Sequence, residues 1–291
     1  MVQSPKIQAF FDEPSNTVSY LIVDPSTRAA AVIDPVLDYN HRDGVVSTTS
    51  AKRILSEIKD AGLTLQWVLE THAHADHLSA APFFRSTTGA RIVIGEHITE
   101  VQRIFSKIFN LTDISCTGKE FDKLVRDGET FPLGNLHVSV MHTPGHTPAC
   151  VTYRIGDTAF VGDTLFMPDY GTARADFPGG DARTLYRSIR ALLALPPATR
   201  MFVCHDYKAP GRDHYAWETT VANQLAHNTH VHEGISEDEF VRLREERDAT
   251  LPAPELLLPA IQVNIRAGRL PQPEPNGVAY LKIPLQHTSI V

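Results

Sequence analysis

The segment from Thr71 to His77 reads Thr-His-Ala-His-Ala-Asp-His, and it constrains the fold of this chain more than any other feature. Four side chains able to bind a metal lie within six residues there, directly after the apolar run Trp67–Leu69. Such a run followed by a histidine cluster is typical of a strand that ends in a metal-binding loop. Because imidazoles this close together are costly unless a metal or hydrogen-bond partners use them, we interpret the segment as part of a metal site.

Residues of the same chemical type follow other short apolar segments. His146, Asp163 and His205 each come just after a run that is compatible with a strand, and the first two stand next to a glycine. Glycine lets the backbone turn sharply where a side chain must point toward a shared centre. Asp34 shows the same pattern earlier, at the end of Ala30–Ile33. The recurrence favours one metal site built from several strand ends.

The motifs Thr-His-Ala-His-Ala-Asp-His, Pro-Gly-His-Thr, Gly-Asp-Thr and Cys-His-Asp together resemble the metallo-β-lactamase superfamily, over roughly residues 10–221. The resemblance implies an α/β fold, the αββα sandwich, with the metal between the two sheets at one edge. It implies places in the metal site for seven residues: His72, His74, Asp76, His77, His146, Asp163 and His205. Asp34 would be a structural residue that supports the metal loop through hydrogen bonds.

Ligand count by itself favours a dinuclear hydrolase. Two metal ions could share Asp163, with three histidines on one ion and the remaining residues on the other, and a bridging hydroxide would attack a carbonyl. The two sets would be His72, His74 and His146, and Asp76, His77 and His205. The ligand types suit zinc, iron and manganese alike, so they do not identify the metal.

The segment Gly171–Phe177, which reads Gly-Thr-Ala-Arg-Ala-Asp-Phe, resembles persulfide dioxygenases within this superfamily. The segments Thr143–Tyr153 and His205–Tyr207 and the C-terminal tail resemble them as well. Glyoxalase II shares the histidine cluster and Gly-Asp-Thr-Leu-Phe, but it usually has another segment in place of Ala-Arg-Ala-Asp-Phe. The subfamily resemblance therefore favours the dioxygenases.

This resemblance implies a catalytic centre with one non-haem Fe(II) per chain, held by His72, His146 and Asp163. Two histidines and one carboxylate leave open positions for a substrate sulfur and O2. The implied reaction oxidises glutathione persulfide with O2 to sulfite and glutathione. The other residues would hydrogen-bond near the iron without binding it, or hold a second metal: His74, Asp76, His77 and His205. The main alternative is a dinuclear zinc thioester hydrolase of glyoxalase II type.

Glutathione carries two carboxylates, so its site needs cations. Arg174 matches the arginine of the resembling segment and is our candidate for a bidentate contact with one carboxylate. Tyr207 is a candidate hydroxyl donor to the peptide. The charged run Arg242–Arg247 is interpreted as the solvated face of a helix.

Composition limits the possible partners. A formal net charge of -7 argues against a nucleic-acid partner, and the absence of a long apolar run argues against a membrane span. Three widely spaced cysteines and the lack of a secretory pattern at the N-terminus favour a cytoplasmic protein. We expect a homo-oligomer, a dimer or tetramer. Because no rhodanese-like segment is present, a sulfurtransferase partner would be a separate chain.

We expect residues 1–232 to form the catalytic domain and residues 233–291 to form a helical and proline-rich extension packed on it. Ser236 and Glu239 form a capping-box pattern that predicts a helix to about Asp248. Six prolines between positions 252 and 275 favour an extended path after it. The apolar residues of 256–265 predict that this path docks on the main domain.

Overall fold

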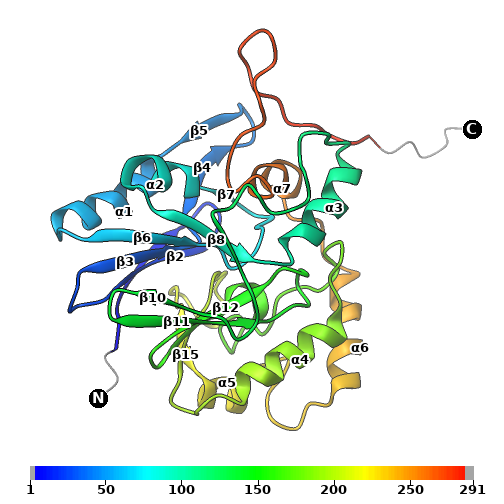
Figure 1. The fold of residues 1–291 in the computed structure, drawn as a ribbon. Coiled ribbons are helices and arrows are strands. Elements are labelled where there is room, and N and C mark those ends of the chain that lie inside the picture. Colours follow the sequence, from blue (N-terminus) through cyan, green and yellow to red (C-terminus); the bar gives the residue numbers. More distant parts are fainter. Residues whose placement is uncertain (1–3, 286–291) are drawn as a thin grey trace, which may run out of the picture.

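The computed structural model describes residues 4–285 and arranges them in layers of helix, sheet, sheet and helix (Figure 1). The first sheet has the spatial order β1 (Lys6–Asp12), β2 (Thr17–Val23), β3 (Ala29–Ile33), β6 (Thr64–Leu69), β8 (Arg91–Gly95) and β9 (Lys123–Val125). The second has the order β10 (Thr130–Leu133), β11 (Leu136–His142), β12 (Val151–Ile155), β13 (Thr158–Phe160), β14 (Arg200–Phe202) and β15 (Glu218–Thr220). The expected α/β sandwich is confirmed.

Helices cover the outer face of each sheet. The first sheet lies under α1 (Thr49–Asp60), α2 (Ala81–Thr88) and α3 (Ile98–Ile108), and the second under α4 (Ala182–Leu193), α5 (Val221–His227) and α6 (Glu237–Asp248). A small sheet has the order β5 (Val45–Ser47), β4 (Val36–Asn40) and β7 (Leu78–Ser79), and it lies beside α7 (Leu257–Asn264). None of the helices formed by residues 4–285 has the length and apolarity needed to cross a membrane.

Three apolar cores separate the four layers. Phe84 and Phe105 pack beneath the first sheet's helices, Tyr20 and Phe160 pack between the sheets, and Leu185 packs between the second sheet and α4. Every residue of β2 is buried, because this strand is covered on both faces. Burial on both faces explains why its second half, residues 20–23, is a continuous run of apolar and aromatic residues rather than an alternating one.

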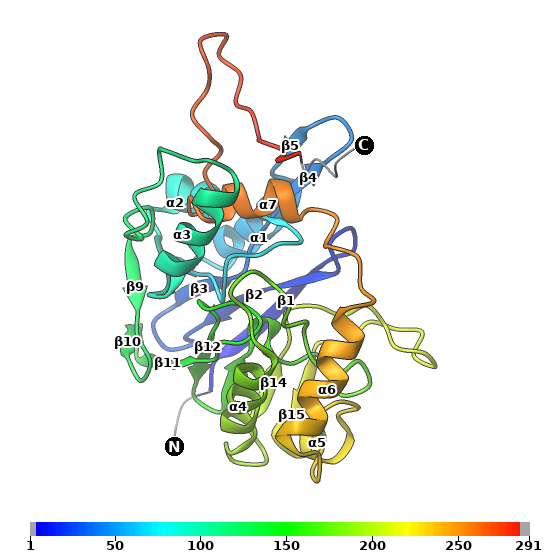
Figure 2. The same cartoon turned by 90° about the vertical axis from the view of Figure 1, so that its right-hand side faces the viewer.

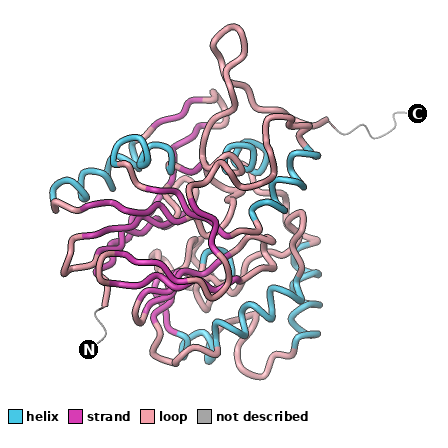
Figure 3. Tube along the Cα trace, viewed as in Figure 1, coloured by secondary structure: helices cyan, strands magenta, loops and turns pink. Residues whose placement is uncertain are grey.

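The direction of the strands brings the metal-type residues to one edge. β3, β6 and β8 pair in parallel, so Asp34 and the loop after Leu69 leave the first sheet on the same side. In the second sheet β13 and β14 are parallel, and two antiparallel pairings give β11 the same direction as β13. The residues that follow these strands lie in loops or in the single turn η1 (Gly162–Thr164) (Figure 3). Ligand-type residues at strand ends therefore converge from both sheets.

The C-terminal extension spans the sandwich. Figure 2 shows α6 beside α4 and α5, and α7 beside α1, α2 and α3. The capping box at Ser236 is confirmed, because its hydroxyl accepts a hydrogen bond from Glu239 N–H and the Glu239 carboxylate accepts one from Ser236 N–H. The prediction that the chain is extended after this helix is wrong for residues 257–264, which form the helix α7. Pro259 lies in the first turn of α7, where a missing N–H breaks no helical hydrogen bond.

Candidate metal centre

His72, His146 and Asp163 come together from both sheets. One ligand atom from each lies within 4.8 Å of the others, and all three side chains are buried. The Asp163 Oδ2 atom is 3.9 Å from His72 Nε2 and 3.7 Å from His146 Nε2. His72 Nε2 and Asp163 Oδ1 have no hydrogen-bond partner among residues 4–285. Buried polar atoms without hydrogen-bond partners destabilise the folded state, so this set of donor atoms fits a metal ion that would bind them.

The other nitrogen of each histidine is held by the protein. His146 Nδ1–H donates to Arg174 O at 2.8 Å, and this leaves the lone pair of Nε2 free to bind a metal ion. His72 Nδ1 lies 3.0 Å from Thr71 Oγ1, whose hydroxyl donates to Asp34. Burial, and then the nearby His74 and His146, hold the pKa of His72 well below its usual value. His72 is therefore neutral, which is the form that binds metal.

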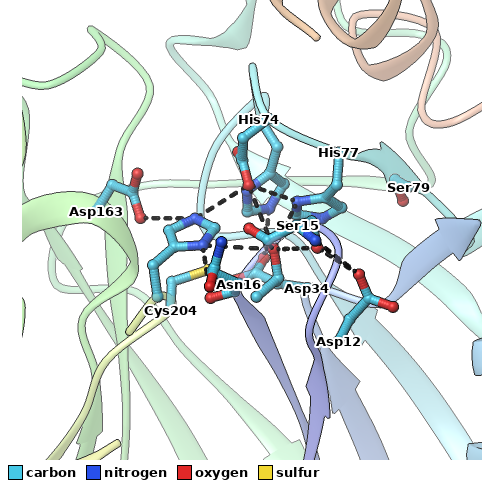
Figure 4. Close-up of polar contacts among 12 residues, drawn as sticks. Asp12, Ser15, Asn16, Asp34, His74, His77, Ser79, Asp163 and Cys204 are labelled. Carbon is cyan, nitrogen blue, oxygen red and sulfur yellow. Dashed lines mark hydrogen bonds and ion pairs between the residues drawn. The ribbon is translucent and has the colours of Figure 1, made fainter. Parts of the chain in front are cut away.

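A second group of side chains adjoins the first. His205 Nε2 lies 3.4 Å from Asp76 Oδ2 and 3.3 Å from Asp163 Oδ1, so Asp163 stands between the two groups. His77 Nε2, His205 Nε2 and His74 Nδ1 are buried and have no hydrogen-bond partner within the described residues. All seven residues singled out from the sequence thus gather in one place. Figure 4 shows part of the arrangement, with Asp163 on one side and His74 and His77 on the other.

His74 lies between two carboxylates. Its Nε2–H donates to Asp34 Oδ1 at 2.9 Å, and Glu70 Oε2 is 3.4 Å away. Burial alone would lower the pKa of His74, but the charge of Asp34 raises it well above the usual value. Asp34 also accepts from the N–H and the hydroxyl of Thr71, so the structure places it where the expected supporting role requires. Cys204 lies beneath the site, with its Sγ 3.6 Å from Asp34 Oδ2.

Two residues at the site were not identified from the sequence. Glu70 is acidic and stands directly before Thr71 at the end of a buried strand, which is the signal that could have revealed it. Thr17, at the start of β2, is fully buried, and its Oγ1 lies 3.3 to 3.4 Å from Asp76, His77 and His205. No local pattern marks Thr17, because its contacts are far away in the sequence.

Gly145 explains the Pro-Gly-His motif. Its φ of 132° is unfavourable for other residues, and a Cβ there would lie 2.3 Å from the backbone nitrogen of Leu185. Gly145 O also accepts from Asp181 N–H, and the Asp181 side chain caps α4 by accepting from Thr184 N–H. The glycine therefore lets α4 approach the loop that carries His146.

A cavity of about 230 Å³ opens beside His146 and Asp163. Arg174 and Tyr207 line it, so both predicted substrate residues are near the metal group. The guanidinium of Arg174 is already engaged by Asp176, at 2.5 and 2.7 Å, and by a backbone carbonyl. Arg244 and Arg247 of α6 line the same cavity, and Arg244 is almost fully buried. The interpretation of Arg242–Arg247 as a purely solvated face is therefore wrong.

A larger cavity of about 650 Å³ meets the same site from the other side. It reaches Asp76, His77 and Tyr207, and its lining includes the acidic residues Asp12 and Glu255. The two cavities share Asp76 and Tyr207. The two cavities are therefore neighbours at the metal group, and the lining of the smaller one includes Arg247 whereas that of the larger one includes Asp12 and Glu255.

Helix α6 holds the loop that supports His146. Arg244 is almost fully buried, pairs with Asp248 at 2.7 Å and donates to Thr172 O. Asp248 Oδ2 accepts from Ala175 N–H at 2.8 Å. The carbonyl that accepts from His146 belongs to Arg174, between these two anchored residues. A path of hydrogen bonds thus connects the C-terminal extension to a metal-site histidine.

Comparison with known proteins agrees with this geometry. The family profile described as the metallo-β-lactamase superfamily matches residues 12–205. A probable metallo-hydrolase of Burkholderia pseudomallei is 53% identical, over 96% of this chain and 98% of its own length. A protein of Dictyostelium discoideum named glyoxylase B2 is 48% identical, over 99% of each chain.

More distant matches carry another name. The mitochondrial persulfide dioxygenase ETHE1 of Homo sapiens is 30% identical, over 90% of this chain and 88% of its own length. The crystal structure of ETHE1 from Myxococcus xanthus superposes with a TM-score of 0.73 at 34% identity, covering 91% of this chain and all of that one.

Proposed function

Because the chain belongs to the metallo-β-lactamase superfamily of metal-dependent enzymes, we propose that it is a glutathione-dependent persulfide dioxygenase. The reaction consumes glutathione persulfide, O2 and water and yields sulfite, glutathione and two protons. The observation that carries the proposal is the group His72, His146 and Asp163 beside an open cavity. Two histidines and one carboxylate on one side of an ion are the ligand set of mononuclear iron oxygenases.

In this proposal His72, His146 and Asp163 hold one Fe(II) per chain. Bound there, the iron would supply the redox chemistry by which O2 oxidises the terminal sulfur. Arg174 O keeps His146 in the tautomer that presents Nε2, and Thr71 does the same for His72. His205 lies next to the second oxygen of Asp163, at 3.3 Å, and Asp76 lies beside His205; in this proposal neither of the two binds the iron.

The cavities determine how the substrate would lie. Arg247 places positive charge beside the metal group, where a glutathione carboxylate would bind, and Arg174 would bind a carboxylate by exchanging its contacts with Asp176. Tyr207 lies where the two cavities meet and can donate its hydroxyl to the peptide. These groups bind and orient the glutathione moiety so that its sulfur reaches the three ligands.

One observation favours a second candidate, a dinuclear zinc thioester hydrolase. His74, His77 and His205 each present a buried, unpartnered nitrogen within the described part of the chain, beyond the three ligands that one iron needs. The name of the Dictyostelium relative points in the same direction.

Metal analysis with an oxygen electrode distinguishes the two candidates. The protein is loaded anaerobically with Fe(II) and given glutathione persulfide, and a second sample is loaded with Zn(II) and given a glutathione thioester. The dioxygenase proposal expects one iron per chain and oxygen uptake matched by sulfite. Two zinc ions per chain, thioester cleavage and no oxygen uptake by the iron-loaded sample would reject it.

A further inference from the structure

We infer that Asn264, on helix α7 of the C-terminal extension, is a positioning residue that sets the path of the metal loop. Its side chain is buried and lies against the loop that carries His72, His74, Asp76 and His77. Asn264 is 187 residues away from His77 in the sequence, so no motif connects the two.

The Asn264 side chain binds the backbone of the metal loop at two of the loop's histidines. The Nδ2 group donates to His74 O at 2.8 Å and to His77 O at 2.7 Å. Within residues 4–285, these are the hydrogen bonds that the structure gives to the backbone of residues 72–77. A loop without a ladder or helix of its own depends on such side-chain contacts for its shape.

A second route leads from Asn264 to the ring of His74. The Oδ1 atom accepts from Ser79 N–H at 2.9 Å, and the Ser79 hydroxyl donates to the carboxylate of Glu70. The other oxygen of Glu70 lies 3.4 Å from His74 Nε2. Asn264 therefore contacts the backbone carbonyl of His74 directly, and it is connected to the imidazole of His74 through Ser79 and Glu70.

The helix that carries Asn264 is itself fixed in place. Ala260 and Val263 pack with Leu78 of β7, and Ile265 O accepts from the side chain of Gln102. Gly268 has a φ of 79°, and a Cβ there would lie 2.6 Å from Ser79 O, so the chain after α7 runs directly against the loop's end. Because α7 is held in place by these contacts, Asn264 can fix the backbone path of the metal loop instead of moving with it.

The chain offers a matched control on the same helix. Gln262 is equally buried and also makes three hydrogen bonds through its amide, but they go to Leu258 and Lys282 and not to the metal loop. Removing either amide takes away a similar set of buried contacts. Only the loss of Asn264 releases the histidine carbonyls.

The test uses the full-length protein and Co(II), whose visible spectrum reports ligand geometry. Asn264→Ala should stay folded, weaken Co(II) binding by about ten-fold or more and shift the absorption bands. Gln262→Ala should lower the melting temperature of the metal-free protein to a similar degree but leave Co(II) affinity and spectrum unchanged. Asn264→Asp, which keeps only the acceptor toward Ser79, should behave like Asn264→Ala.

An Asn264→Ala protein with wild-type Co(II) affinity and spectrum would overturn the inference. Equal weakening in Gln262→Ala would overturn it as well, because general loosening of α7 would then explain both results. The inference rests on the loop binding a metal and not on the reaction. Wild-type protein that binds Co(II) but shows no oxygen uptake with Fe(II) would reject the proposed function and leave the role of Asn264 intact.

Discussion

The histidines at the site have different roles in the proposed enzyme: His146 binds the iron, and His205 does not. His146→Ala removes one of three proposed iron ligands and should lower iron affinity by more than about 100-fold, beyond the effect of losing an outer partner. His205→Ala should keep one iron per chain, because His205 binds no metal in the proposed enzyme. Iron and zinc per chain, measured after anaerobic loading, check both. Equal loss of iron in the two variants would place His205 among the ligands.

His230 is a residue whose protonation affects folding. It is buried, and its Nδ1 accepts from Thr172 N–H at 3.1 Å. Burial, followed by Arg244 and Arg247, lowers the pKa of His230 from 6.5 to about 4. Between these values the unfolded chain takes up a proton that the folded chain does not, so stability falls as the pH falls from 6.5 toward 4. This gap corresponds to at most about 3 kcal/mol.

His230→Asn isolates this contribution, because asparagine offers an acceptor to Thr172 N–H and does not titrate. Urea unfolding at pH 7 and pH 4.5 should show a smaller loss of stability on acidification in the variant than in the wild type. The same pH dependence in both proteins would show that His230 is charged in the folded state or that other groups dominate.

At the scale of elements, α6 contributes a buried ion pair rather than a solvated face. Asp248→Ala would leave Arg244 buried without its carboxylate and Ala175 N–H without an acceptor. Breaking a buried pair in this way costs about 3–5 kcal/mol. Arg242→Ala, which removes an exposed pair with Glu246 on the same helix, should cost less than about 1 kcal/mol.

Urea unfolding of both variants measures the difference. Asp248→Ala should also weaken metal binding, because Ala175 adjoins the carbonyl that orients His146. Similar stabilities for the two variants would mean that the buried pair does not hold the loop.

At the scale of the whole molecule, we propose that the extension folds as part of the sandwich and not as a separate unit. Phe240 is fully buried with Leu185, and Ile261 and Ile265 are fully buried with Phe105.

A chain ending at residue 232 should therefore aggregate, because it exposes the apolar cores that α6 and α7 cover. A chain ending at Leu270 should stay soluble and bind metal, since residues 271–285, the described part of what is removed, are largely exposed. Light scattering and Co(II) titration test both, and a soluble, metal-binding chain of residues 1–232 would contradict this expectation.

The layer order was implied by the resemblance to a superfamily, whereas the strand ends and the seven metal-type residues were determined by the sequence by itself. Each strand end and each metal-type residue is a local pattern: an apolar run, a glycine, a histidine or aspartate at a strand's end. The capping box at Ser236 was likewise predictable, because a helix start is decided within four residues.

Only the tertiary structure decided which nitrogen of each histidine faces the centre, and what supports it. Arg174 O, Thr17 and Asn264 act on residues far away in the sequence, and such contacts leave no periodic or local trace. The same reason applies to α6, where a run of charges looks solvated until a loop 72 residues away covers Arg244. Hydrogen-bond partners of buried groups are chosen by the packing of the layers, which no single segment contains.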